Sequence, residues 1–159
     1  NVARAIAAFE RTLITHDRFD DFLEGDDKAL NAQELRGLKF FMETGCTTCH
    51  FGPTLGGMQF QKVGLVNAYE TDDLGRYDVT KDESDKYKFK VPMLRNIAIT
   101  APYFHDGKVK TLEEAVQKMG WLQLGLELTE QQTRDLVAFL HTLTDKPRAK
   151  QAASAVGAN

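Results

Sequence analysis

The sequence has few cysteines, no long apolar run and little net charge, and each of these absences excludes a class of protein. Among 159 residues there are two cysteines, both in one short motif, so none is left over for a disulfide. No apolar stretch approaches the ~20 residues of a membrane-spanning helix, so we expect no membrane span. A net charge of −3 is too mild for a nucleic-acid-binding protein, so we expect no nucleic-acid partner.

The sequence also lacks a secretory signal, an initiator methionine and any internal repeat. It opens at Asn1 directly in a helical pattern, which we interpret as the start of a mature chain or of a fragment. The length fits one domain, and the apolar fraction of 42% is ordinary for a folded protein.

What the sequence does contain is the run Cys46-Thr47-Thr48-Cys49-His50. A C-x-x-C-H run is the attachment motif of a c-type haem: two thiols on one turn reach two vinyl groups, and the histidine binds the iron. A zinc site would need further Cys or His ligands at short spacing, and a thioredoxin-like motif would need a βαβ pattern. Neither accompanies the run, so we predict one covalently bound haem c. Because haem c is attached outside the cytoplasm, we also predict a periplasmic location.

The hydrophobic pattern predicts a mostly α-helical, cytochrome c-like haem domain with long loops that wrap the haem. An apolar stripe runs through residues 2–13, and three capping boxes open later helices, with Gly45 ending the helix before the motif. We expect residues 1–143 to form the haem domain, with a leading helix and linker over 1–30, and 144–159 to form a flexible C-terminal tail. Residues 72–90 are highly charged and predict a surface loop. The boxes pair Asn31 with Glu34, Thr111 with Glu114, and Thr129 with Gln132.

The sixth iron ligand is left open by spacing alone. A methionine thioether opposite the histidine raises the reduction potential, and there are four methionines. Met42 precedes the motif and is expected to pack in the core, and Met58 follows His50 too closely to reach the other haem face. Met93 and Met119 both follow at sufficient distance, and His105 is an alternative ligand that would give a bis-histidine haem. His16 and His141 lie near predicted helix ends, where a positive imidazole would suit the helix dipole.

Longer stretches of the chain resemble the C-terminal, electron-transferring haem domain of bacterial di-haem cytochrome c peroxidases. The stretches are Ala7-Ala8-Phe9-Glu10-Arg11-Thr12-Leu13, Gly45 to His50, Val91-Pro92-Met93-Leu94-Arg95-Asn96, Thr100-Ala101-Pro102-Tyr103-Phe104-His105-Asp106-Gly107, and Met119-Gly120 with Gln123-Leu124-Gly125.

The resemblance implies Met119 as the axial ligand and leaves Met93 to packing. It also implies a calcium ion bound in part by the backbone carbonyls of Thr100 and Pro102, with His105 near the junction between two haem domains. We further expect Arg95 and Gln123 to contact the haem propionates or the ligands.

The implied function is electron relay. Such a domain accepts electrons from a small periplasmic donor, a cytochrome c or a cupredoxin, and passes them to a peroxidatic haem that reduces hydrogen peroxide to water. That second haem belongs to an N-terminal domain, and this chain has one C-x-x-C-H run, so we expect no catalytic residue here. Two alternatives remain: a free-standing mono-haem carrier, and a MauG-like enzyme, in which a tyrosine replaces the axial methionine. The sequence leaves the electron donor and the oligomeric state, including a homodimer, open.

Overall fold

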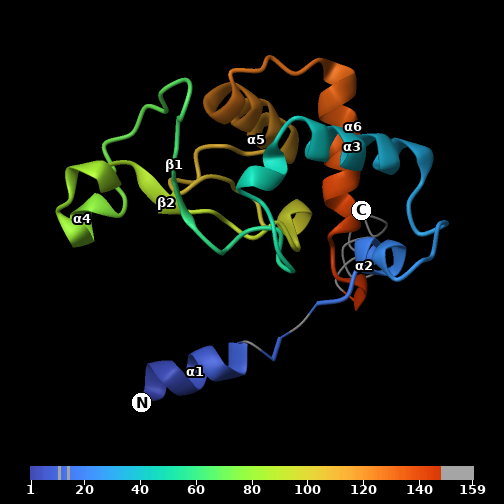
Figure 1. Cartoon of the computed structure of the whole chain (residues 1–159), viewed down its shortest axis with the longest axis horizontal. Helices are drawn as coiled ribbons and strands as arrows, with labels where there is room; N and C mark the ends of the chain where they lie inside the picture. Colours follow the sequence, from blue (N-terminus) through green and yellow to red (C-terminus); the bar gives the residue numbers. More distant parts are fainter. Residues whose placement is uncertain (11, 14, 148–159) are drawn as a thin grey trace, which may run out of the picture.

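The computed structural model describes residues 1–147 except 11 and 14, and it confirms the mostly α-helical fold (Figure 1). Short 3₁₀ turns and one π-helical turn connect the longer helices. The helices are α1 (Val2–Glu10), α2 (Arg18–Leu23), α3 (Ala32–Glu43), α4 (Tyr77–Thr80), α5 (Leu112–Met119) and α6 (Glu130–Thr142). Across the described residues, no helix is long and apolar enough to cross a membrane.

The centre of the domain is the crossing of α3 and α6 (Figure 1). Both helices start with the predicted reciprocal capping boxes at Asn31 and Thr129. The box at Thr111 is half formed: its side chain accepts a hydrogen bond from the Glu114 amide, without the reciprocal bond that the prediction required. Apolar side chains of α6, with Phe139 almost fully buried, fill the core beneath α3.

Gly37 is the point of closest approach between α3 and α6. A Cβ atom at this position would overlap the carbonyl oxygen of Asp135 and lie 2.9 Å from the Cβ of Phe139. The glycine therefore allows the two helix backbones to approach closely.

We predict that Gly37→Ala lowers the free energy of unfolding by about 2–3 kcal/mol, because the overlap outweighs the higher helix propensity of alanine. Urea unfolding followed by circular dichroism measures the change. Lys39→Ala on the exposed side of α3 is the control, since the Lys39 side chain is 71% exposed. Equal stability of the Gly37→Ala variant and the native chain would contradict the tight crossing.

The segment between the haem motif and α5 is mostly loop, as predicted, but it also contains a small antiparallel sheet. Strand β1 (Phe60–Lys62) pairs with β2 (Lys88–Lys90), so that Phe60 lies opposite Lys90. Between the strands, the charged segment forms α4 and the turn η2 (Glu83–Asp85), which project from the body at the left of Figure 1. The predicted surface loop is therefore partly helical.

The two ends of the domain differ in how they are held. Helix α1 has no buried residue and lies apart from the body in Figure 1. Of the predicted tail, residues 144–147 are described: Thr144 is buried, and the Asp145 amide donates to the Asn96 side chain at 2.9 Å. These contacts place Thr144 and Asp145 within the folded domain, whereas residues 148–159 lie outside the described part of the chain.

Candidate haem site

The C-x-x-C-H motif forms one tight turn directly after α3. Gly45 adopts a left-handed conformation (φ 89°), which ends the helix and starts the 3₁₀ turn η1 (Cys46–Thr48). The His50 amide donates to the Cys46 carbonyl oxygen at 2.9 Å, which closes the turn around both thiols. Cys46 and Cys49 are free and half-buried, and burial raises the pKa of the Cys46 thiol. The free thiols of Cys46 and Cys49 and the imidazole of His50 thus lie on one turn.

The His50 ring is fixed through one nitrogen. Its Nδ1 lies 3.3 Å from the carbonyl oxygen of Leu55, so in the tautomer that donates this bond Nε2 carries the lone pair. Burial lowers the pKa of His50, which favours the neutral imidazole that metals bind. Hydrogen bonding of the ring to the backbone at Leu55 and Pro92 acts on this pKa in the opposite direction, but burial is the larger effect. Two free thiols and an oriented, neutral imidazole are the donor set that a covalently attached haem requires, so the residues fit the group.

Met119 differs from the other three methionines in its surroundings. It is the last residue of α5 and is partly buried, and it is followed by the π-helical turn η4 (Gly120–Leu124). Such turns are frequent at functional sites. Met58 and Met93 are 64% and 49% exposed, and Met42, which was expected in the core, is 53% exposed. The expectation for Met42 is therefore wrong, because its side chain projects outward from α3; the assignment of Met119 as axial ligand stays a prediction.

Arg95 and Gln123 have hydrogen-bond partners within the protein, and their contact with the haem propionates or ligands stays a prediction. The Arg95 guanidinium is occupied by the carboxylates of Asp17 and Asp20 and by the carbonyl oxygen of Pro53. Gln123 donates to the Lys62 carbonyl oxygen at 3.0 Å and accepts from the Leu65 amide at 2.9 Å. Both side chains therefore brace loops around the motif. These contacts span 42 to 78 residues of sequence, which local patterns do not reveal.

His105 lies on the surface beside β2. Its ring stacks on Phe89, with ring centroids 4.0 Å apart, and its Nε2 lies 3.1 Å from the Thr71 hydroxyl. The ring thus has a side-chain partner on an exposed face, in keeping with a position near a junction.

The prediction for His16 is wrong, because His16 precedes the N-terminus of α2, where the helix dipole disfavours a cation. Its Nε2 instead contacts Asp21 at 2.9 Å. His141 is in the last turn of α6, as the dipole argument expects.

The predicted calcium ligands lie in an exposed turn. Thr100 follows the 3₁₀ turn η3 (Ile97–Ile99), and a cis peptide bond joins Ala101 to Pro102. Among the described residues, the group of acidic and histidine side chains close enough to share a metal is His16, Asp21 and Glu24, and the Lys146 ammonium already lies 2.7 Å from Asp21. Calcium binding at Thr100 and Pro102 therefore stays a prediction.

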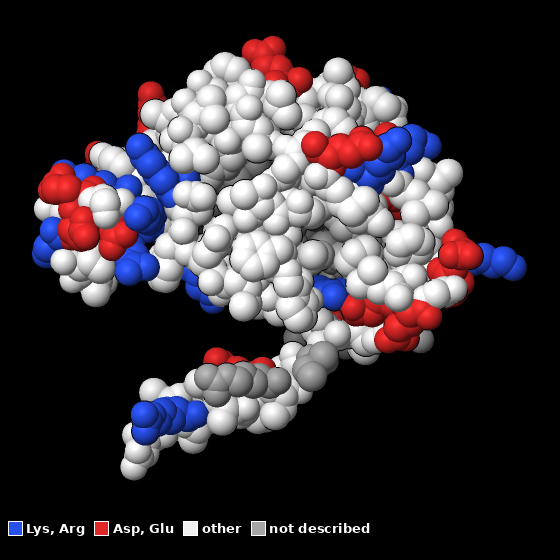
Figure 2. All heavy atoms as spheres, viewed as in Figure 1, with Lys and Arg blue, Asp and Glu red and all other residues white. Residues whose placement is uncertain are grey.

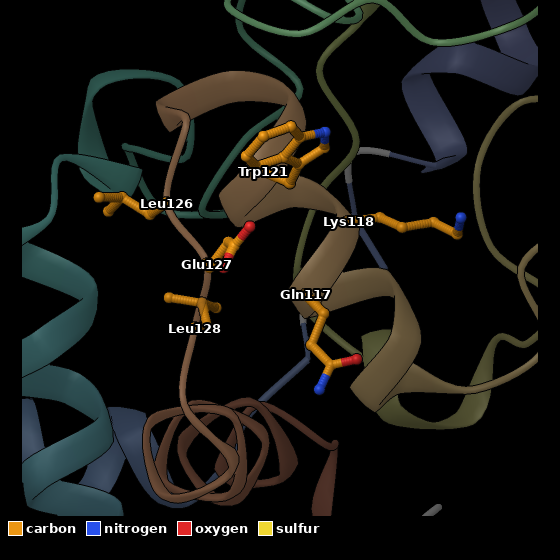
Figure 3. Close-up of a pocket in the computed structure, with 6 residues that line it drawn as sticks. All are labelled: Gln117, Lys118, Trp121, Leu126, Glu127 and Leu128. Atoms are coloured by element: carbon orange, nitrogen blue, oxygen red, sulfur yellow. The ribbon is translucent and has the colours of Figure 1, made fainter.

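An open cavity of about 330 Å³ lies beside α5 (Figure 3). Its wall includes Lys118 and Trp121, which flank Met119 in the sequence, but Met119 does not line it. The remaining lining residues are Gln117, Leu126, Glu127 and Leu128 (Figure 3).

The Leu55 carbonyl oxygen was missed by sequence reasoning. A backbone acceptor leaves no residue-type signal, because every residue has a carbonyl group. The adjoining Gly56-Gly57 pair gives an indirect signal, since paired glycines mark a loop whose backbone takes unusual angles, and both have positive φ.

Comparison with known proteins places this site among haem proteins. A family model described as Cytochrome c matches residues 35–144. The chain is 50% identical over 153 residues to the cytochrome c551 peroxidase of Nitrosomonas europaea, covering 94% of this chain and 46% of that protein. It is 49% identical over 157 residues to the cytochrome c551 peroxidase of Pseudomonas aeruginosa, covering 94% and 45%.

One similar solved structure is that of a MauG-like protein associated with microbial copper homeostasis. The two share 34% identity with a TM-score of 0.74, over 89% of this chain and 56% of that chain. The chain spans about half the length of the curated relatives it matches.

Proposed function

The chain belongs to the cytochrome c family, and on that premise we propose that it is the electron-transferring haem c domain of a di-haem peroxidase. Its predicted resemblance to the haem domains of cytochrome c peroxidases is confirmed by the identities of 50% and 49%. The observation that carries the proposal is the turn at Cys46, Cys49 and His50, with the imidazole oriented through its Nδ1. Electron transfer requires a fixed ligand geometry, and this turn supplies it.

Each residue of the site has one task in this proposal. Cys46 and Cys49 would hold the haem covalently, and His50 and Met119 would supply the ligands to its iron. The haem supplies a store for one electron at a raised potential, since a thioether ligand favours the reduced state. The protein holds the ligands, buries the His50 ring and keeps its Nδ1 hydrogen-bonded, so that little has to reorganise when the charge changes.

The partner in this proposal is a second haem domain that carries the peroxide chemistry. The chain spans about half of its relatives and has one C-x-x-C-H run. Helix α1 supports such a partner, because the side chains of its apolar stripe are all exposed and none of its residues is buried. The exposed fractions are 76% for Val2, 53% for Ile6, 63% for Phe9 and, just beyond the helix, 62% for Leu13.

The donor in this proposal is a small cytochrome c or cupredoxin in the periplasm, the compartment in which haem c is attached. In the view of Figure 2, charged side chains gather over α4 and α2, and the middle of the face carries few. The net charge of −3 is also small. We therefore expect a weak, mainly apolar encounter that depends little on salt.

A MauG-like function is the second candidate, because the similar solved structure carries that description. In that type a tyrosine takes the place of the axial methionine, and here the position holds Met119. This residue favours the peroxidase-type domain. A free-standing mono-haem carrier is less favoured, because 94% of this chain aligns with proteins twice its length.

Stopped-flow electron transfer tests the proposal. The haem-loaded chain, oxidised, is mixed with a reduced mono-haem cytochrome c or a reduced cupredoxin, and we expect rapid reduction of its haem. The His50→Ala variant should lose the low-spin spectrum and the rapid reduction together. A native chain that accepts no electron from either donor would refute the proposed role.

We predict that calcium binds poorly to this chain alone. Two carbonyl oxygens, at Thr100 and Pro102, fall well short of the ~6–8 oxygen ligands that calcium takes, so water and the partner domain would have to supply the rest. Isothermal titration calorimetry of calcium chloride into the chain measures the affinity, with magnesium chloride as the control. Tight, calcium-selective binding to the isolated chain would show that the site is complete without a partner.

A further inference from the structure

The loop that follows the haem motif is bonded along its length to the segment 91–95. The two backbones run side by side, and hydrogen bonds join them at three successive points. These bonds run from the Gly57 amide to the Val91 carbonyl oxygen (2.8 Å), from the Leu94 amide to the Leu55 carbonyl oxygen (3.2 Å), and from Arg95 Nε to the Pro53 carbonyl oxygen (3.1 Å).

The middle bond bears directly on the haem ligand. The Leu55 carbonyl oxygen accepts from the Leu94 amide and also lies 3.3 Å from His50 Nδ1. The adjoining Gly56 passes so close to Pro92 that any Cβ would overlap the Pro92 carbonyl oxygen. A shift of the loop relative to segment 91–95 therefore moves the acceptor that orients His50.

The Arg95 side chain makes the last of these three bonds, and two carboxylates fix its position. Its guanidinium donates to Asp20 at 2.7 and 3.0 Å and to Asp17, and its side chain is 13% exposed. The Asp17 side chain is fully buried and also caps α2, accepting from the Phe19 amide at 3.0 Å. The arginine thus connects the start of α2 to the loop after the haem motif.

We propose that Arg95, held by Asp17 and Asp20, is a positioning residue that fixes the loop of residues 51–57 and, through the Leu55 carbonyl, the orientation of His50. This inference rests on the proposed function, in which His50 ligates the haem iron. It gives a physical task to the arginine of the Val91-Pro92-Met93-Leu94-Arg95-Asn96 stretch. It also means that the segment joining α1 to the domain is connected to the iron ligand through the hydrogen bonds of Arg95, the backbone from Pro53 to Leu55, and the contact of the Leu55 carbonyl oxygen with His50.

The geometry requires an arginine rather than any cation. Three different nitrogens of the planar guanidinium bind two carboxylates and one carbonyl at the same time. A lysine ammonium is a single point charge, which can stay with the carboxylates but cannot also reach Pro53 in the same arrangement. Arg95→Lys should therefore keep the ion pairs with Asp17 and Asp20 and lose the hydrogen bond to the Pro53 carbonyl oxygen.

The experiment compares Arg95→Lys with Arg18→Lys in the haem-loaded chain. Arg18 lies in the same leading segment, and within the described part of the chain its side chain donates to Glu34, at 2.7 and 2.8 Å, and to the Ala29 carbonyl oxygen rather than to the loop. We measure the exchange rate of the His50 Nδ1 proton by NMR, the reduction potential, and the thermal unfolding midpoint. For Arg95→Lys we expect about tenfold faster exchange and a raised potential, because a weaker bond to Nδ1 makes the imidazole a poorer electron donor.

Arg18→Lys should lower the unfolding midpoint and leave the Nδ1 exchange and the potential unchanged. Asp20→Asn, which weakens the hold on Arg95 from the other side, should shift both readouts in the same direction as Arg95→Lys. If Arg95→Lys loses stability alone, as Arg18→Lys does, the arginine is merely structural and the inference is overturned. If the native chain itself shows no histidine-ligated, low-spin haem spectrum, it is the proposed function that fails, and this outcome is distinct from the first.

Discussion

Met119→Leu removes the absorption band of methionine-ligated haem in the far red and lowers the reduction potential of the domain. The reason is that leucine leaves one face of the iron without a protein ligand, and the loss of the thioether removes its preference for the reduced iron. Optical spectroscopy and a spectroelectrochemical titration measure both changes. Leucine and methionine have similar volumes, so α5 should keep its packing and the unfolding midpoint should change little.

Met93→Leu is the matched control, because Met93 is the other methionine far enough along the chain to cross the haem, and its side chain is 49% exposed. We expect this variant to keep the band and the potential. The assignment fails if Met93→Leu abolishes the band while Met119→Leu keeps it. A band that survives both substitutions would point to a ligand other than these two.

Peroxide turnover by the isolated chain stays at the background rate. Peroxide must bind iron before its O–O bond can break, and under the proposed ligation by His50 and Met119 the iron would offer no vacant position. The chain should exchange electrons with a small cytochrome while it oxidises almost none of that cytochrome in the presence of peroxide. Steady-state oxidation of reduced cytochrome c measures this, with the Met119→Leu variant as the comparison, since an opened iron should raise the rate.

Adding a separately produced peroxidatic haem domain of a close relative should restore turnover. Phe9→Asp, which places a charge in the apolar stripe of α1, should weaken this restoration and leave the optical spectrum unchanged, because Phe9 is exposed and no residue of α1 is buried. Rapid turnover by the native chain alone, with its methionine band intact, would contradict the closed-iron assignment. Restoration that is insensitive to Phe9→Asp would show that the partner docks elsewhere.

Local features of this fold were readable from the sequence. The capping boxes at Asn31 and Thr129, the helix stop at Gly45 and the C-x-x-C-H turn all depend on residues within a few positions of each other. The pairing of β1 with β2 was missed, because the two strands are three residues long and a sheet that short has no clear alternating pattern.

The roles of polar side chains were the least predictable part. Arg95 was expected at the haem edge, since arginine often binds carboxylates such as propionates. It does bind carboxylates, but they are those of Asp17 and Asp20, more than 70 residues earlier in the chain. The residue type therefore predicted a contact between arginine and a carboxylate. Which carboxylates it binds depends on the fold, which brings Asp17 and Asp20 to Arg95.

Asn96, next to Arg95, has a consequence for how this domain can be joined to others. Its amide donates to the Leu143 carbonyl oxygen, its side chain accepts from the Asp145 amide, and the His16 carbonyl oxygen accepts from the Lys146 amide. Residue 16, where the backbone enters the compact body, thus lies beside residue 146, close to the end of the described chain (Figure 1). A domain whose two ends lie side by side can be inserted into a surface loop of another domain without distorting either domain. Its ends can also be linked to each other to make a circular permutant.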